Sequence, residues 1–252
     1  MPKQNPSSPQ SVFGKISAIL DTFTVEQPTL SLAEITAATA ISKTTVFRLL
    51  QELADLGYVK QAGKSYRLGL SAFRLGMVAK EQMGLNDLLD DLLRPLAEKT
   101  QETVITATLD RDQILYLHVI ESLNPLRFVA GAGARRALPF GATGMALLSQ
   151  LDLEKQKALL AAPFQTFTAK TITDLAGYLA RLDKIEQSQL VIERGEYYDG
   201  IMAFAVPVQG KRPLTFTVVG PEERILPTQD LIIEELQHAA ENFKKLQFEW
   251  PI

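Results

Sequence analysis

Basic, hydroxylated and aromatic side chains share one side of the segment 42–56, and these residue types suit contacts with nucleic acid. Apolar residues recur there at i, i+3, i+4, i+7 and i+10, the buried stripe of an amphipathic helix: Val46, Leu49, Leu50, Leu53 and Leu56. The other side carries Lys43, Thr44, Phe47 and Arg48. An aromatic ring can contact a thymine methyl group, and arginine or lysine can bond guanine edges or phosphates. The pattern fits a base-reading helix and, equally, an ordinary amphipathic helix in which Phe47 packs on a neighbour.

The elements before this segment predict how it is positioned. Apolar residues at helical spacing indicate a first helix over 12–23. Ser31 and Glu34 make a capping box for a helix over 32–39, and Ser42 caps the next helix, which ends at Gly57. Two capped helices joined by a turn of two or three residues are the layout of a helix-turn-helix.

A basic hairpin is predicted directly after the third helix. Residues 58–61 and 65–68 read as two short strands, and the turn between them contains Gly63. The hairpin carries Lys60, Lys64 and Arg67, which can pair with phosphates beside the major groove. A helix, a helix-turn-helix and a basic hairpin in this order predict a winged helix-turn-helix that binds double-stranded DNA.

Charge and composition agree with a DNA-binding module on a larger acidic body. Residues 1–75 contain eight Lys and Arg against five Asp and Glu, a net charge of +3, and residues 76–252 contain 18 against 24, a net charge of −6. The 252 residues include no cysteine, which excludes disulfides and cysteine zinc sites and fits a reducing, cytoplasmic setting. No apolar run is long enough to span a membrane, so we expect no membrane contact. Residues 1–11, rich in proline, are expected to form a disordered leader.

Residues 75–94 are expected to form a linker helix. Positions at alternating three- and four-residue spacing make a short apolar seam with one polar break: Leu75, Val78, Gln82, Leu85, Leu89 and Leu92. Such a seam fits a helix packed on its own domain and a helix that joins two chains equally well. Pro95 is expected to end or kink this helix.

The residues from 95 to 252 predict an α+β domain. Runs rich in β-branched and aromatic residues lie at 102–109, 113–119, 126–130, 201–208 and 214–219. Helices are expected at 143–151, 152–160, 174–194 and 228–248. Because strands and helices do not alternate strictly, we expect an antiparallel sheet with flanking helices.

From about residue 12 onwards the chain resembles the IclR family of bacterial transcriptional regulators. In the first domain the motifs are Ile41-Ser-Lys-Thr-Thr-Val-Phe-Arg-Leu-Leu-Gln-Glu-Leu53, Leu56-Gly-Tyr-Val59 and Tyr66-Arg-Leu-Gly-Leu70. The resemblance implies a DNA-binding domain over 12–74. It places the base-reading positions at Ser42, Lys43, Thr44, Thr45, Phe47 and Arg48. It also implies contacts between chains through this domain and the linker, in a homodimer or a homotetramer.

The C-terminal motifs resemble the effector-binding domain of the same family, which is related to GAF and PAS folds. They include Glu102-Thr-Val104, Gly131-Ala-Gly-Ala-Arg-Arg-Ala-Leu-Pro139, Gly144-Met-Ala-Leu-Leu-Ser149, Arg194-Gly195, Ala203-Phe-Ala-Val-Pro-Val208 and Val219-Gly-Pro-Glu-Glu-Arg-Ile225. The resemblance implies a small-molecule effector, such as a carboxylic acid or an aromatic metabolite. It places ligand contacts at Gly131, Gly133, Thr143, Gly144, Met145, Asp199, Ala203 and Thr217.

The pocket motifs depart from the family pattern. The stretch 139–144 is shorter than usual, and several residues of an acidic loop are missing between Asp199 and Gly200. Ala203 occupies the position of a pocket cysteine, and of two hydroxyl positions on the late strand Thr217 keeps one while Val219 loses the other. These changes favour a smaller or more apolar ligand, or a degenerate pocket that binds none.

The sequence contains no pattern that predicts an enzyme, a cofactor or a metal site. We interpret His118 and His238 as structural or surface residues, and Arg135 and Arg136 as a solvated loop pair. There is no HExxH motif, no P-loop and only a partial glycine fingerprint over 131–136.

Three hypotheses follow. The chain is a ligand-responsive DNA-binding regulator, a DNA-binding regulator without a small-molecule ligand, or an enzyme or sensor whose winged helix makes protein contacts. The basic hairpin and the pair Phe47 and Arg48 argue against the third.

Overall fold

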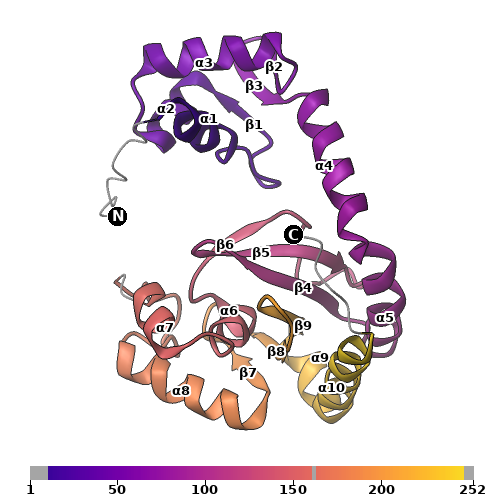
Figure 1. The fold of residues 1–252 in the computed structure, drawn as a ribbon. Coiled ribbons are helices and arrows are strands. Elements are labelled where there is room, and N and C mark those ends of the chain that lie inside the picture. The colour runs from indigo at the N-terminus through magenta and orange to yellow at the C-terminus, as the bar shows by residue number, and fades with distance from the viewer. Residues whose placement is uncertain (1–10, 161–162, 247–252) are drawn as a thin grey trace. The chain divides into compact units, whose positions relative to one another are not determined.

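The described part of the chain forms two compact units. A computed structural model describes residues 11–160 and 163–246, and the units divide between Met83 and Gly84 (Figure 1). Apart from Ser11, the leader predicted over 1–11 lies outside the described residues.

The N-terminal unit contains the three helices expected from the sequence. Their bounds are α1 Val12–Leu20, α2 Leu32–Thr39 and α3 Lys43–Asp55. The backbone N–H of Ser31 donates to the Glu34 carboxylate at 2.7 Å, and the Ser31 hydroxyl accepts the N–H of Glu34, so the capping box forms. Ala40 ends α2 in the left-handed region with φ of 53°, and this compact turn leads directly into α3.

A small antiparallel sheet completes the unit. The expected hairpin forms from β2 (Val59–Ala62) and β3 (Ser65–Leu68), and an additional strand, β1 (Thr29–Ser31), pairs with the other edge of β3. Three residues that run directly into a helix cap show no alternating pattern, so β1 has no sequence signal of its own. Tyr66 of β3 is buried in a core that also contains Ile19 of α1.

The expected linker helix over 75–94 consists of two helices in the structure. α4 spans Leu70–Met83 and α5 spans Leu85–Thr100, and Gly84 between them has φ of 59°. This left-handed conformation, which glycine adopts without strain, interrupts the helix at Gly84. Pro95 does not end α5. Proline has no N–H, so the carbonyl one turn earlier in the helix lacks its usual partner. Because Pro95 lies on the exposed side of the helix, water can bond that carbonyl instead.

A six-stranded sheet forms the centre of the C-terminal unit, and every neighbouring pair is antiparallel, as predicted. The strand order is β6-β5-β4-β9-β8-β7. The bounds are β4 Thr103–Asp110, β5 Gln113–Ile120, β6 Arg135–Ala137, β7 Val191–Arg194, β8 Ile201–Val208 and β9 Leu214–Pro221. β4, β8 and β9 are buried on both faces, which explains their nearly continuous apolar runs.

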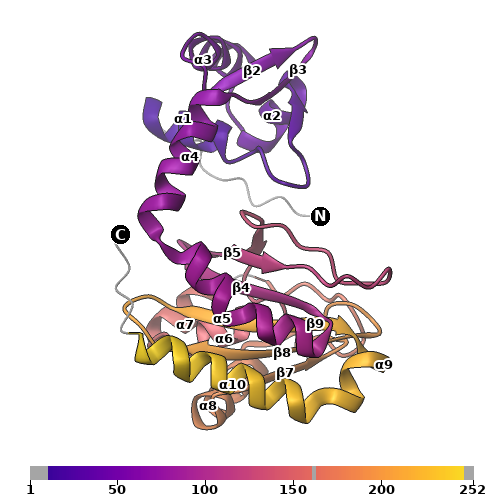
Figure 2. The same cartoon turned by 90° about the vertical axis from the view of Figure 1, so that its right-hand side faces the viewer.

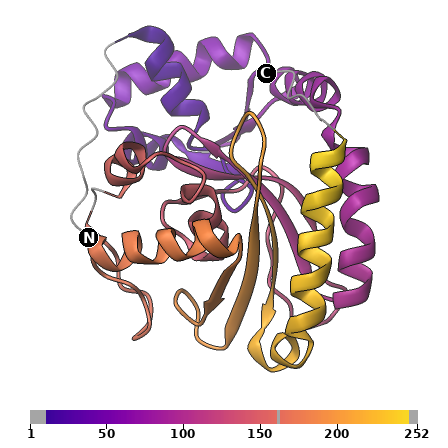
Figure 3. The ribbon, with the colours of Figure 1, turned by 60° about the horizontal axis from the view of Figure 1, so that its bottom comes forward.

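Helices cover both faces of this sheet (Figures 2 and 3). α5 and α10 (Gln229–Lys245) pack side by side on one face. α6 (Gly141–Leu148), α7 (Leu153–Leu159) and α8 (Leu175–Ser188) lie on the other. A short helix, α9 (Glu222–Ile225), and a 3-10 turn over Leu226–Thr228 connect β9 to α10. The predicted α+β class is confirmed.

Two predicted elements are wrong. Residues 126–130 form no strand, because their carbonyl groups bond side chains: Thr103 Oγ1 donates to the carbonyl of Phe128 at 2.7 Å. The helix predicted over 174–194 ends at Ser188, where Gln189 adopts φ of 54°, and the chain then forms β7. Hence residues 191–194 belong to the sheet.

Candidate functional site

The buried side of α3 is as predicted from its spacing, except at one end. Val46, Leu49, Leu50 and Leu53 are buried. Leu56 is 65% exposed, because it is the C-cap residue and lies beyond the last helical turn. Its assignment to the buried stripe was therefore wrong.

The N-terminal half of α3 presents the residues that suit a base edge. Lys43, Thr44 and Arg48 are exposed, and Phe47 is 47% exposed, so its ring does not pack in the core. Among the described residues no carboxylate pairs with Lys43 or Arg48. The hydroxyls of Ser42 and Thr45 bond each other at 2.9 Å and fix the start of the helix. An aromatic ring and two cations on one helical face form a surface suited to a DNA groove.

The hairpin, which follows this helix in the sequence, adds three exposed cations. Lys60 of β2 and Arg67 of β3 are directly opposite each other in the register, and Lys64 lies in the turn after Gly63. Like charges directly opposite on a two-stranded ribbon are destabilising. Within the described part of the chain no acidic side chain pairs with these three, so a polyanion is a suitable partner for them.

The C-terminal unit contains a small cavity on the α6 face of the sheet. Its volume is about 30 Å³, which is room for one or two water molecules. The lining comes from five strands, the start of α6 and two loops: Ile105, Tyr116, Phe128, Phe140, Gly141, Ala142, Thr143, Glu193, Tyr197, Tyr198, Ile201, Ala203, Thr217 and Val219. The aromatic rings touch one another, with centroids of Phe140 and Tyr197 4.5 Å apart.

Most hydroxyl groups of this cavity bond within the protein. Thr143 of α6 and Thr217 of β9 share a hydrogen bond of 3.0 Å between their side-chain oxygens. The Tyr197 hydroxyl donates to the carbonyl of Pro139, and its oxygen lies 3.4 Å from the hydroxyl of Tyr178 in α8. Burial raises the pKa of Tyr197 far above its usual value, so this phenol stays neutral.

Glu193 is the single acidic residue in this lining, and it is 4% exposed. Its Oε1 accepts the N–H of Glu196 at 2.5 Å. Burial, with a smaller contribution from the nearby Glu196, raises the pKa of Glu193 to about 7, and the backbone N–H groups and Arg181 oppose the shift. Arg181 is already paired with Glu196, and no described cation lies within ion-pair distance of Glu193.

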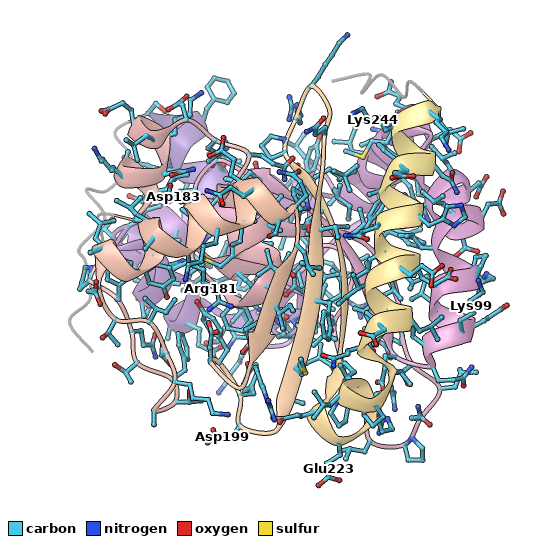
Figure 4. The ribbon with its side chains drawn as sticks, turned by 90° about the horizontal axis from the view of Figure 1, so that it is seen from below. Lys99, Arg181, Asp183, Asp199, Glu223 and Lys244 are labelled. Carbon is cyan, nitrogen blue, oxygen red and sulfur yellow. The ribbon has the colours of Figure 1, made fainter. Side chains whose placement is uncertain are left out.

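The structure brings three of the eight predicted effector positions to the cavity. These are Thr143, Ala203 and Thr217. The other five lie elsewhere: Gly144 and Met145 are buried in α6, Gly131 and Gly133 belong to the turn before β6, and Asp199 is exposed in the turn between β7 and β8 (Figure 4). Five of the eight predicted positions therefore lie outside the lining of this cavity.

The cavity residues that the sequence did not indicate include Glu193, Tyr197 and the two phenylalanines Phe128 and Phe140. Glu193 was missed because residues 174–194 were interpreted as one helix. The alternation of inward Val191 and Glu193 with outward Ile192 and Arg194 is the signal that could have identified a strand.

An ion pair between the buried Glu102 and the partly exposed Arg224 holds the loop that carries Phe128. Arg224 bonds both oxygens of the Glu102 carboxylate, at 2.6 and 2.8 Å, and also donates to the carbonyl of Leu126 at 2.9 Å. Glu102 is 2% exposed. The pair raises the pKa of Arg224, which keeps its charge. Gly220 is required beside it, because a Cβ there would overlap the Glu102 carboxylate.

The remaining polar candidates have structural partners. Arg135 and Arg136 belong to β6. Arg135 pairs with Asp110, and the Arg136 guanidinium lies 5.8 Å from the centre of the Tyr116 ring. The interpretation of these two arginines as a solvated loop pair is therefore wrong. His118 lies 3.4 Å from Asp90, and His238 lies 3.1 Å from Asn242. The described residues contain no metal-ligand cluster, and none of their helices is both long and apolar enough to cross a bilayer.

Comparison with known proteins gives matches to both units. Residues 14–63 match the IclR helix-turn-helix domain, and residues 78–245 match the C-terminal domain of the bacterial transcriptional regulator IclR. A curated relative, the HTH-type transcriptional regulator KdgR of Dickeya chrysanthemi, is 35% identical over 205 residues, which cover 80% of this chain and 66% of that regulator.

Solved structures agree with the fold. An IclR transcriptional regulator of Silicibacter sp. TM1040 superimposes with a TM-score of 0.86 at 26% identity, covering 96% of this chain and 98% of that one. An IclR homologue of Microbacterium hydrocarbonoxydans in complex with 4-hydroxybenzoate has a TM-score of 0.79 at 18% identity, covering 94% and 99%, and shows a shared fold. Because both of its units match IclR domains, the chain belongs to the IclR family of DNA-binding transcriptional regulators.

Proposed function

We propose that this regulator binds a pseudo-palindromic operator as a dimer and that a small molecule in the C-terminal unit changes its DNA affinity. In this mechanism two copies of α3 enter successive major grooves, and the hairpins contact flanking phosphates. Ligand control requires that the ligand bind one arrangement of the dimer more tightly than the other.

The observation that carries the DNA-binding half is the exposed face of α3. Phe47 and Arg48 lie next to each other on it, and Lys43 is also exposed, with no acidic partner for either cation in the described residues. A base step with its phosphates can accept both the ring and the cations.

The exposed apolar side chains of α4 support the dimer. None of the residues of α4 is buried, and five large apolar ones are exposed: Leu70, Phe73, Leu75, Met77 and Val78. Apolar surface of this kind in a regulator helix is suited to the same helix of a second copy. Pairing of two dimers would give a homotetramer.

A regulator without a small-molecule ligand remains the second candidate, and the small cavity favours it. A volume of about 30 Å³ is far below the ~300 Å³ at which drug-sized ligands are usually held. The buried, unpaired Glu193 favours the ligand-responsive alternative, because a buried carboxylate is normally paired.

The test is selection of duplexes from a random DNA pool by the purified full-length protein. We expect enrichment of an inverted repeat whose half-sites lie about one helical turn apart. Failure to enrich any sequence, with binding lost at physiological salt, would contradict the proposal and favour protein contacts by the winged helix.

A further inference from the structure

The cavity on the α6 face combines an aromatic wall with a single acidic group. Five of its lining residues are aromatic: Tyr116, Phe128, Phe140, Tyr197 and Tyr198. The centroid of Phe140 is 4.5 Å from that of Tyr197 and 6.1 Å from that of Tyr198, and Phe128 is 6.2 Å from Tyr198. These contacts join four of the rings into one continuous aromatic surface.

Glu193 reaches this cavity from β7. In the sheet register it is opposite Ala203, which is opposite Val219, and all three line the cavity. The carboxyl group is thus bordered by two apolar positions on the floor and faces the same space as the rings. A buried carboxylate is expensive unless it is paired, and no lysine, arginine or histidine is part of this lining.

The lining has little that would hold an anion. It contains no cationic side chain, and the hydroxyls of Thr143 and Thr217 bond each other, which leaves one of their two protons for a ligand. An anionic ligand would also lie near Glu193, and two like charges in a space of low polarity repel each other strongly.

We propose that the cavity binds a small organic ammonium ion, held by Glu193 as counter-ion and by the aromatic rings through cation–π contacts. The faces of aromatic rings attract cations, and cages of this composition bind alkylammonium groups. The inference rests on the proposed function, because it takes the cavity as the ligand site of the regulator. It changes the ligand class implied by the family resemblance from carboxylate to ammonium.

The size of the cavity limits the occupant. About 30 Å³ admits a head group of a few heavy atoms in place of one or two water molecules. Tyr198 is half exposed and lies where the lining meets solvent, so a longer alkyl chain would extend past this residue.

The experiment is a ligand-observed NMR titration of the full-length protein with three probes that share a propyl chain. Propylamine is a cation near neutral pH, propan-1-ol is neutral and propanoate is an anion. We expect propylamine to bind at least tenfold more tightly than propan-1-ol, and propanoate to show no binding at the same concentrations. Equal affinities, tighter binding of propanoate, or no binding of any probe would overturn the inference.

Two variants identify the groups that cause the preference. Glu193→Gln keeps an oxygen for the N–H of Glu196 and removes the charge, so the preference for propylamine should fall to less than threefold. Tyr198→Leu keeps an apolar wall at a half-exposed position. It should weaken the binding of propylamine severalfold and leave the affinity for propan-1-ol unchanged. The second variant tests the inference even if the first does not fold.

The matched control is Glu223→Gln, which removes the same charge from an exposed residue of α9 at the edge of the unit (Figure 4). Its preference for propylamine should equal that of the unchanged protein. If Glu223→Gln lowers the preference as much as Glu193→Gln, overall charge is responsible and the inference is wrong. Operator binding by the same preparations is measured separately. If the protein binds its operator but shows no preference for propylamine over propan-1-ol, this inference is contradicted and the proposed function is not.

Discussion

The two units of this protein place their functional groups in opposite ways. In the N-terminal unit the groups suited to DNA, among them Phe47, Arg48 and Lys64, point away from the core and have no acidic partner among the described residues. In the C-terminal unit the corresponding groups, above all Glu193, point inward between strands that are distant in the sequence. An outward site depends on the periodicity of one helix, whereas an inward site depends on the register of the whole sheet.

This difference has an energetic consequence. The exposed cations of the hairpin are hydrated, so removing one of them should change the affinity for DNA more than the free energy of unfolding. The buried groups of the C-terminal unit have lost their water, so each change there alters folding stability as well as any binding.

The largest effect is expected for Gly220→Ala in β9. The added Cβ would displace the Glu102 carboxylate from Arg224. Breaking a fully buried ion pair costs about 3–5 kcal/mol, and because the Arg224 side chain is 35% exposed we expect the lower end, about 3 kcal/mol. Chemical denaturation should show this loss in the transition of the C-terminal unit. The control is Gly76→Ala in α4, where a Cβ meets nothing within 4 Å and should stabilise the helix by about 0.5–1 kcal/mol. Equal stability of the two variants would contradict the assigned role of the ion pair.

The second prediction concerns pH. Burial raises the pKa of Glu193 from 4.5 to about 7, so the folded state binds more protons than the unfolded state between these values. Stability therefore falls as pH rises from about 4.5 to 7, and it changes no further through this group above 7. The contribution is about 3 kcal/mol, from 1.36 kcal/mol per pKa unit. Glu196 and Arg181 are the charged groups that act on it.

The measurement is the free energy of unfolding at pH 5 and pH 8 for the unchanged protein and for Glu193→Gln. The variant should gain relative stability at pH 8, because it has no carboxylate to ionise. A difference between the two proteins that does not vary with pH would show that Glu193 is not buried as an ionisable group.

A smaller effect is expected on DNA at α3. Arg48→Ala should weaken binding to the selected operator by about 1–3 kcal/mol if the guanidinium contacts a base edge, and its effect on random DNA should be much smaller. Because Arg48 is exposed and unpaired in the described structure, the melting temperature should stay the same. The role is contradicted if affinity for the operator does not change, or if affinity for both DNAs falls equally.

The smallest effect is expected for the hairpin turn. Lys64→Ala should lower affinity for all sequences alike and reduce the slope of log K against log salt by about 0.9, the value for one phosphate contact. Lys157→Ala, which removes a charge from exposed α7 in the other unit, is the control and should leave the slope unchanged. A loss confined to the operator would assign Lys64 to base reading.

Local sequence patterns predict the helices, caps and hairpin of the N-terminal unit almost completely. The capping box at Ser31 and Glu34, the turn at Ala40 and the buried stripe of α3 are local patterns, and each occurs in the structure within a residue or two. Local hydrogen bonds and helical periodicity suffice to fix which side of such a helix is exposed. The errors were also local: Leu56 lies one residue past the helix, and β1 is too short to show a pattern.

The composition of the cavity, in contrast, follows from the way the strands pair in three dimensions. Thr143, Ala203 and Thr217 were indicated by the family resemblance, but Glu193 lines the cavity because β7 pairs with β8 in a register that places it opposite Ala203. A shift of one residue in that register would turn Glu193 to the other face. The hairpin of β7 and β8 is local, but Ile105 and Thr217 join Glu193 in the lining only because β9 pairs with both β8 and β4, and no local pattern in a single sequence encodes the pairing of β4 with β9. For the same reason Gly144 and Asp199, which are close to cavity residues in the sequence, are not part of the cavity.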